Sequence, residues 1–377
     1  MPYLDHAATT FVRPEVLAAV EPLLAKLYGN PSGGHAVGRE ARRVLDEARE
    51  EIADFCGAPA QGVIFTSGGT EADNWVIDGV LDAAATRDKH RIVTTAIEHK
   101  AILEAAHRRE KWDAEVIEVG VDALGRVDPH DVATASRGAT LVSVMAANNE
   151  LGTIQDLRAI AREVRREAPE AVLHTDAVQV APWLDLAELT QGFDLLTLSS
   201  HKLGGLKGTG CLVSRTSIKV APLLVGGGQE LGLRAGTQDA IGAMAMALAL
   251  RLAVAERAEA TSRITSLRNR FLAELHDLTG AHSTVEGANV LPGHAHVVFP
   301  GMVAEELLVA FDRADLQATA GSSCASGATE SSHVLKAIGL DRAAVRGAVR
   351  FTLGHTTTEL DIDRACSIIG QAVTQLS

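Results

Sequence analysis

Short apolar runs alternate with amphipathic, helix-like stretches from residue 63 to residue 202 of this sequence. The apolar runs fit buried strands at residues 63–66, 92–95, 115–119, 140–145, 172–175 and 194–198, with helical patterns at 72–85, 101–109, 128–134 and 157–166. Strands that alternate with helices pair in parallel, because parallel strands need a crossover connection. The sequence therefore predicts an α/β fold with a mostly parallel sheet and helices on both of its faces.

The chain is too long for one ordinary hydrophobic core. Its 377 residues suggest two domains. After a long helical pattern over residues 239–275, strand and helix patterns alternate again but more sparsely. We therefore expect residues 15–255 to form a large domain, and residues 1–14 to join residues 256–377 in a smaller α+β domain.

The composition argues against several classes of protein. The net charge is -13 and no basic patch stands out, so nucleic acid is not an expected partner. The most apolar run, residues 240–250, is too short to cross a bilayer, and the N-terminus does not resemble a signal peptide. We therefore expect no membrane partner and a cytoplasmic location. The four cysteines are far apart and lack CxxC spacing, so neither a metal site nor a disulfide framework is expected.

Polar residues follow the predicted strands at the points where those strands end. They are Gly68, Gly69, Thr70, His99, Asn149, Asp176 and the run from Ser199 to Lys202. In an open parallel sheet, ligands bind beyond the carboxyl ends of the strands, where the loops converge. The sequence therefore predicts a ligand site built from these residues.

Two of these segments have a defined chemistry. Lys202 follows a buried strand at the mouth of the sheet, where burial and neighbouring dipoles can lower the pKa of an amine that forms a Schiff base. The turn Ser67-Gly-Gly-Thr-Glu71 precedes a helix, whose N–H groups and dipole can bind phosphate. Simpler interpretations are a surface lysine in a glycine-rich turn and an ordinary capping turn.

Four single residues are further candidates, each with a simpler alternative. His99 could stack on a flat ring and move protons, or be a structural histidine. Asp176, if buried, needs a cationic partner such as a protonated pyridine nitrogen; otherwise it caps a helix. Cys324 lies among small residues, which predict an exposed loop, and it could be a nucleophile or an inert thiol. Arg350, in an apolar strand-like run, could bind a carboxylate in bidentate fashion or pair with a local acid.

Taken together, these segments resemble the cysteine desulfurases (NifS/IscS-like) of the class V aminotransferase family, which are pyridoxal-phosphate enzymes of fold type I. The resemblance covers nearly the whole chain, and its markers occur in the right order. They are Ser67-Gly-Gly-Thr-Glu71, Glu98-His-Lys100, Asn148-Asn-Glu150, His174-Thr-Asp-Ala-Val-Gln179, Ser200-His-Lys202, Gly226-Gly-Gly-Gln-Glu230, Leu233-Arg-Ala-Gly-Thr237 and Gly321-Ser-Ser-Cys324. The family implies a large domain with a mostly parallel sheet of seven-stranded type, and a smaller C-terminal domain that carries a mobile cysteine loop.

The resemblance also implies three catalytic residues. Lys202 would carry pyridoxal 5′-phosphate as a Schiff base and move the α-proton of the substrate. His99 would stack on the ring and exchange protons. Cys324 would attack the sulfur of L-cysteine, which leaves a persulfide on the enzyme and L-alanine as the product.

The same resemblance implies how cofactor and substrate are held. Asp176 would bind the pyridine nitrogen, and Gln179 and Asn149 would bind the ring oxygen and nearby groups. Arg350, with Asn149, would bind the substrate carboxylate. The phosphate would be bound by Gly69, Thr70, Ser199, His201 and, from the other subunit of a homodimer, Thr237.

The resemblance leaves the fate of the sulfur and some alternatives open. The sulfur would pass to an acceptor protein in iron–sulfur cluster assembly, tRNA thiolation or another sulfur pathway. A selenocysteine lyase or another pyridoxal-phosphate lyase or aminotransferase could use the same scaffold. Cys324 argues against an aminotransferase, which does not need it, but does not exclude a selenocysteine lyase. A binding protein that keeps the fold is a third possibility, against which the presence of Lys202, Asp176, His99 and Cys324 argues.

Overall fold

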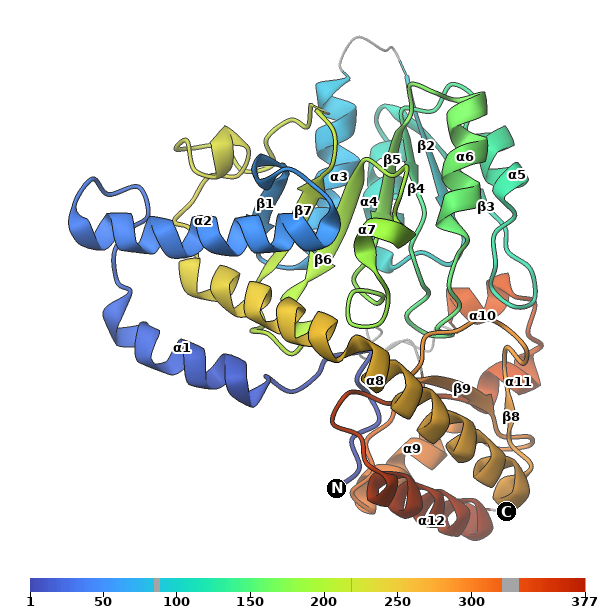
Figure 1. Ribbon diagram of the computed structural model, residues 1–377. Coiled ribbons are helices and arrows are strands. Elements are labelled where there is room, and N and C mark those ends of the chain that lie inside the picture. Colours follow the sequence, from blue (N-terminus) through green and yellow to red (C-terminus); the bar gives the residue numbers. More distant parts are fainter. Residues whose placement is uncertain (85–88, 218, 321–331, 377) are drawn as a thin grey trace.

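The computed structural model describes residues 1–84, 89–217, 219–320 and 332–376. The helices are α1 (Pro14–Lys26), α2 (Ala36–Cys56), α3 (Gly69–Ala83), α4 (Lys100–Glu110), α5 (Pro129–Ala135), α6 (Leu157–Glu167), α7 (Leu186–Leu189), α8 (Ala240–Thr279), α9 (Ala304–Arg313), α10 (His333–Ala337), α11 (Arg342–Arg346) and α12 (Glu359–Leu376). The strands are β1 (Val63–Thr66), β2 (His90–Thr95), β3 (Ala114–Val119), β4 (Leu141–Ser143), β5 (Val172–Asp176), β6 (Leu195–Ser199), β7 (Gly210–Ser214), β8 (His282–Ser283), β9 (His294–Val298) and β10 (Ala348–Thr352). Figure 1 shows α2 and α8 in front of the large sheet, and α12 below with the small one.

The large sheet has seven strands in the order β1-β7-β6-β5-β4-β2-β3. Its pairs from β6 to β3 are parallel, whereas β7 runs antiparallel to both of its neighbours, β6 and β1. The predicted α/β fold with a mostly parallel sheet is thus confirmed. The alternation pattern missed β7, because this strand follows β6 through a glycine-rich turn without an intervening α-helix.

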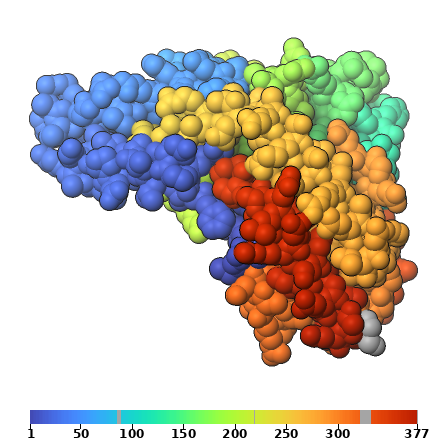
Figure 2. Space-filling view, turned by 60° about the horizontal axis from the view of Figure 1, so that its bottom comes forward, coloured from blue at the N-terminus to red at the C-terminus, as the bar shows by residue number. Residues whose placement is uncertain are grey.

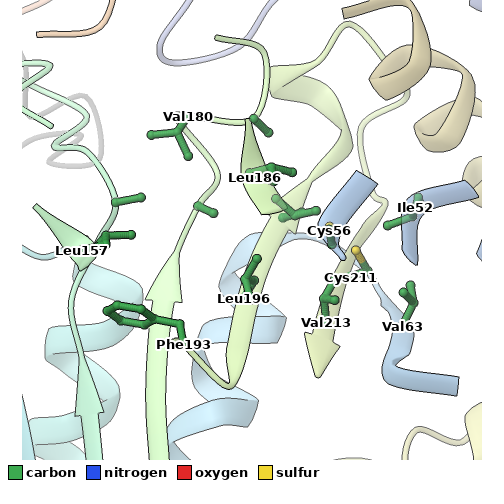
Figure 3. Close-up of a cluster of buried hydrophobic side chains, with 14 of the residues drawn as sticks. Ile52, Cys56, Val63, Leu157, Val180, Leu186, Phe193, Leu196, Cys211 and Val213 are labelled. Carbon is green, nitrogen blue, oxygen red and sulfur yellow. The ribbon is translucent and has the colours of Figure 1, made fainter. Parts of the chain in front are cut away.

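Both faces of the large sheet are buried, which explains the continuous apolar runs in its strands. Successive side chains of a strand point to opposite faces. Accordingly, Leu196 packs in the core with α2, α6 and α8, whereas Leu195 packs with α3 and α4 on the other face. Figure 3 shows the first of these cores, where Leu196 and Val213 of the sheet lie with Ile52 of α2.

The small sheet is antiparallel, with the order β10-β9-β8. Its core contains aromatic side chains from several elements, such as Phe271 of α8 and Phe351 of β10, whose ring centroids are 5.2 Å apart. The N-terminal residue Leu4 is fully buried in this same core. The first residues of the chain therefore pack on the C-terminal part.

Helix α8 runs through both cores. It begins after Asp239, whose carboxylate accepts from Gly242 N at 2.8 Å, and ends at Gly280 in the left-handed conformation (φ 72). Met246 of its first half is buried with the large sheet and Ile264 of its second half with the small one. The boundary expected at residue 255 falls inside this helix and stays a prediction.

Within the described residues, no helix combines the length and apolar character needed to span a bilayer. The same residues hold no group of three or more histidine, cysteine or acidic side chains that could bind a metal ion. Cys56, Cys211 and Cys366 are buried free thiols.

Gly210, the first residue of β7, packs against the turn that joins β1 to α3. A Cβ at this position would lie 2.7 Å from Gly68 Cα and 2.7 Å from Leu198 O. We predict that Gly210→Ala lowers the free energy of unfolding by about 1–3 kcal/mol, because both neighbours are backbone atoms in a packed sheet. Urea denaturation followed by circular dichroism measures this loss.

Gly120→Ala is the matched control, because a Cβ at Gly120 meets no atom within 4 Å. This variant should keep or slightly raise the stability of the wild type, since alanine restricts the unfolded chain. Equal stability of the two variants would contradict the packing role of Gly210.

Candidate active site

A cavity of about 280 Å³ lies at the carboxyl ends of the parallel strands. It brings together ten of the residues predicted from the sequence: Gly69, Thr70, His99, Asn149, Asp176, Gln179, Ser199, His201, Lys202 and Arg350. Thr237 is exposed and does not line the cavity. Cys324 lies outside the described residues.

Lys202 lies in a short 3-10 turn (Ser200–Lys202) that follows β6 directly. Its Nζ donates to the carbonyl oxygen of Ala8 at 2.8 Å and to that of Ala7. Gln179 Nε2 also donates to Ala7 O, at 3.1 Å. The N-terminal segment therefore forms one wall of the cavity, and its backbone carbonyl groups hold the amine of Lys202 in place. The sequence analysis missed this contact.

Asp176 is the last residue of β5 and is 8% exposed. One of its oxygens accepts from Val178 N at 2.9 Å. Burial raises the pKa of the Asp176 carboxyl, against the opposing influence of His99 and Lys202. A cation in the cavity would favour its ionised form, as the hypothesis of a pyridine-nitrogen partner requires.

Asp73, on α3, is a buried acid that the sequence analysis missed. It lines the same cavity and is 1% exposed, and its Oδ1 has no hydrogen-bond partner among the described residues. Burial, followed by the charge of Asp176, raises the pKa of Asp73 well above its usual value. The signal was present in the sequence, because Asp73 follows Thr70 by three residues and so shares its helix face.

His99 is the N-cap of α4. Its Nδ1 accepts from Ala101 N at 3.2 Å, so this geometry assigns the proton of the neutral ring to Nε2. Burial lowers the pKa of His99, and Lys202 and Lys100 lower it further, while Asp176 opposes them. The ring is therefore mostly neutral at pH 7 and can offer Nε2–H as a donor.

The turn between β1 and α3 has the geometry of an anion site. The first N–H groups of a helix lack intrahelical partners, and here they belong to residues that line the cavity, Gly69 and Thr70. A Cβ at Gly69 would lie 3.1 Å from Val178 Cγ2, so a small residue keeps this approach open. His201 contributes from the opposite side, and its Nδ1 lies 3.1 Å from Thr9 Oγ1.

Arg350, in the centre of β10, reaches the cavity from the small sheet. Its guanidinium donates to Asp5 Oδ1 at 2.7 Å and to the carbonyl oxygen of Asn149 at 2.9 Å. It is 1% exposed, so both contacts form away from bulk water. A guanidinium held in this way can bind a carboxylate through two parallel hydrogen bonds.

Further cavity residues were not predicted to line the site, although one of them, Glu150, belongs to the marker Asn148-Asn-Glu150. Met145, Glu150 and His333 all line the cavity. His333 Nε2 lies 2.9 Å from the carbonyl oxygen of Glu98, and Glu150 Oε2 accepts from Ser332 Oγ at 2.6 Å. These contacts join α10 to the loops of the large sheet, over a sequence separation that no local pattern reveals.

The residues present fit pyridoxal phosphate. The cavity offers an amine at Lys202, a helix N-terminus for a phosphate at Gly69, and the buried carboxyl of Asp176 for a ring nitrogen. The raised pKa of Asp176 indicates that this carboxyl lacks sufficient positive charge in its present surroundings. A protonated pyridine nitrogen would supply that charge.

Glu98 precedes His99 in the chain, and its pKa allows the electrostatics of the site to be tested. It is fully buried, and its Oε1 accepts from Met145 N at 2.8 Å and from Thr95 Oγ1 at 2.7 Å. Burial, the main cause, raises the pKa of Glu98 from 4.5 to about 8. The folded chain therefore keeps this proton between these two pH values, whereas the unfolded chain loses it, so wild-type stability falls as pH rises.

Glu98→Gln copies the neutral acid and keeps its acceptor oxygen. We predict that the variant gains stability relative to the wild type by up to about 1.4 kcal/mol per pH unit from pH 4.5 to about 8. Urea unfolding of the two cofactor-free proteins at several pH values measures this difference. A difference that does not change with pH would contradict the raised pKa.

Comparisons with known proteins show the family of this chain. A family model described as aminotransferase class-V matches residues 2–365. A cysteine desulfurase IscS of Dictyoglomus turgidum is 40% identical over 379 residues, which cover 99% of this chain and 95% of that protein. An IscS-like cysteine desulfurase of Mycobacterium tuberculosis is 40% identical over 394 residues, which cover 99% of this chain and 96% of that protein.

Solved structures give the same result. A NifS-like protein has a TM-score of 0.92 at 34% identity and covers 99% of each chain. The structure described as SspA in complex with cysteine has a TM-score of 0.82 at 30% identity, and covers 95% of this chain and all of its own. The fold and family inferred from the sequence are confirmed. The chain belongs to the class V aminotransferase family and, within it, to the pyridoxal-phosphate-dependent cysteine desulfurases.

Proposed function

We propose that this desulfurase converts L-cysteine to L-alanine with Lys202, His99 and Cys324 as its catalytic residues. One observation carries the proposal: a single cavity holds the amine, the neutral imidazole, the buried carboxyl of Asp176 and a helix N-terminus. Each of these groups comes from a different strand end of the large sheet, so their meeting depends on the fold and not on a local motif.

Eight residues would hold the cofactor within one subunit. Lys202 would attach it, and Asp176 would pair with its ring nitrogen. Gln179 and Asn149 would bind its ring oxygen and nearby groups. Pyridoxal phosphate, when bound, supplies an electron sink that stabilises negative charge at the substrate α-carbon. The remaining contacts would go to the phosphate, at Gly69, Thr70, Ser199 and His201.

Substrate binding and proton transfer would use the other cavity residues. Arg350 would receive the substrate carboxylate, with Asn149 beside it. Lys202 would remove the α-proton, because its Nζ is directed by two backbone carbonyls into a fixed position. His99 would donate a hydrogen bond from Nε2–H, since Nδ1 is engaged by the helix N-terminus.

Cys324 would accept the sulfur. Its thiolate would form an S–S bond with the substrate sulfur while the substrate C–S bond breaks. The carbon fragment would take up a proton and leave as alanine, and the persulfide would then pass to an acceptor protein. Burial raises the pKa of Cys56 and Cys366 to about 12, so neither is a competing nucleophile near pH 7.

The enzyme would act as a homodimer. Thr237 is exposed and separate from the cavity of its own chain, so it can complete a phosphate site only across a subunit interface. Figure 2 shows α1 and α2 projecting from the body of the molecule. On this part and on the segment after β7, large apolar side chains are more than half exposed: Phe11, Leu17, Leu24, Tyr28, Val225 and Leu231. A second subunit that covers them would remove this apolar surface from water.

We predict that the wild type with L-cysteine and a thiol reductant releases alanine and sulfide in equal amounts, and that Cys324→Ala releases almost none. The reason is that sulfur has no acceptor on the enzyme without this thiol. Cys366→Ala is the control, because Cys366 is buried on α12 among residues of the small core, and it should keep most of the activity. Full activity of Cys324→Ala would favour a lyase or aminotransferase. A wild type that turns over selenocysteine but not cysteine would favour a selenocysteine lyase.

A mixed dimer tests the role of Thr237. One chain carries Lys202→Ala and the other carries Thr237→Val. If Thr237 acts across the interface, one site keeps both residues, and activity is about half that of the wild type. If it acts within its own chain, both sites are damaged and activity is almost lost. A fully active Thr237→Val homodimer would contradict any role for Thr237.

A further inference from the structure

Segment 226–238 is held in an unusual backbone conformation. Two consecutive non-glycine residues, Glu230 (φ 46) and Leu231 (φ 59), have left-handed backbone conformations. Such a conformation persists only where the surroundings enforce it, and it marks segments whose position matters. The segment begins after β7 and ends just before α8, and it carries Thr237.

An ion pair between Arg49 of α2 and Glu230 anchors this segment. The guanidinium donates to both carboxylate oxygens, at 2.8 and 2.9 Å, and the two side chains are 11% and 2% exposed. Phe65 N of β1 donates to the same carboxylate at 2.9 Å, and the guanidinium lies 5.0 Å from the centre of the Phe65 ring. Gln238, the last residue of the segment, also donates to Glu230, so two positions of the segment meet at one buried charge.

The Glu230 carboxylate is ionised in this setting. Burial, the largest single influence, favours its protonation, but the hydrogen bonds from Arg49, Gln238 and Phe65 N together lower the pKa of Glu230 below its ordinary value. The anchor is therefore charged at neutral pH, and its geometry is specific because the arginine is bidentate.

A second ion pair joins the same segment to the phosphate turn of its own subunit. Arg234 donates to both oxygens of Glu71, at 2.9 and 3.2 Å. Glu71 lies in the first turn of α3 and also accepts from Ser67 N at 2.9 Å. A carboxylate in this turn would repel a phosphate dianion, and Arg234 neutralises that charge.

Arg234 and Thr237 are three residues apart on this anchored segment. Resting on the proposed cross-subunit role of Thr237, we propose that segment 226–238 couples the two cofactor sites of the dimer. A phosphate bound at the turn of one subunit favours the position of Arg234, and the same position presents Thr237 to the partner subunit. Because the first cofactor stabilises the segment position that the second one needs, binding of the second cofactor is favoured.

Arg234 and Glu71 are thus positioning residues. Their substitution has different effects on cofactor affinity in the chain that carries the variant. Arg234→Gln leaves an unpaired carboxylate in the phosphate turn, so cofactor affinity falls in the same chain. Glu71→Gln removes that carboxylate, so affinity in the same chain does not fall. Both variants remove one of the two ion pairs that hold segment 226–238, so both loosen the position of Thr237 and weaken the site in the partner chain.

Mixed dimers with chains of different mass separate these effects. One chain carries the variant and the other is wild type, and cofactor-free dimers are titrated with pyridoxal phosphate. Borohydride reduction fixes the bound cofactor, and mass spectrometry gives the occupancy of each chain. We expect wild-type dimers to load cooperatively, with a Hill coefficient above one. We expect Arg234→Gln to weaken both chains and Glu71→Gln to weaken the partner chain, each by about tenfold.

Two controls keep the outcome clear. Arg234→Lys keeps the charge and should restore most of the affinity in both chains. If Arg234→Gln does not fold, the double variant Glu71→Gln with Arg234→Gln replaces it with two neutral side chains of similar size, and it should weaken the partner chain but not its own.

The proposal is wrong if Arg234→Gln weakens the chain that carries it and leaves the partner chain unchanged. It is also wrong if the wild type loads with a Hill coefficient of one. A different result would overturn the cross-subunit phosphate site on which the coupling rests. This result is a Thr237→Val chain that leaves cofactor affinity in the partner chain unchanged.

Discussion

The buried carboxyl of Asp176 is the charge on which the arrangement of the active site depends. Burial makes its ionised form costly, and the cavity surrounds it with the amine of Lys202 and the ring of His99. Two further acids, Asp73 and Glu98, lie close enough for the charge of Asp176 to raise the pKa of each. Burial raises the pKa of all three carboxyls, and their mutual repulsion opposes the ionisation of all three together, so a cation beside Asp176 would favour its ionised form.

The neutral state of the histidines belongs to the same arrangement. His99 caps α4 and its Nδ1 accepts from the helix backbone. His201, beside Lys202, has a pKa lowered to about 4, mainly by burial and then by Lys202 and Lys207. With His99 and His201 neutral, the cationic side chains that line the cavity are Lys100, Lys202 and Arg350, of which the last two are proposed to bind the cofactor and the carboxylate. In the cavity, neutral histidine rings can thus donate hydrogen bonds, while lysine and arginine side chains carry the positive charge.

The sequence predicted the site well where a residue's position follows from the end of a strand. Asp176, Lys202 and His99 are of this kind, because a parallel sheet places all its carboxyl ends at one edge. It failed where a contact joins distant parts of the chain. The carbonyl oxygens of Ala7 and Ala8 against Lys202 are examples, since a backbone oxygen has no sequence signature.

The missed strand β7 has a related cause. The alternation pattern identifies a strand by its apolar run and by the helix that separates it from the next strand. The run Gly210–Ser214 follows glycines, and no α-helix separates it from β6. The cross-subunit position of Thr237, the role of Cys324 and the domain boundary stay predictions. Each of them depends on something other than the fold of one described chain: a second subunit, residues outside the described ranges, or a cut through a continuous helix.

The position of Leu4 has a consequence for how the chain reaches its native state during synthesis. Leu4 leaves the ribosome long before Phe351 and Ile369, with which it shares a hydrophobic core. The large sheet can form once α8 has emerged, while the N-terminal segment still waits for its place. The wall of the cavity that contacts Lys202 is therefore assembled late, after Phe351 and Ile369 have emerged, so the cofactor site is completed only after both domains have been synthesised.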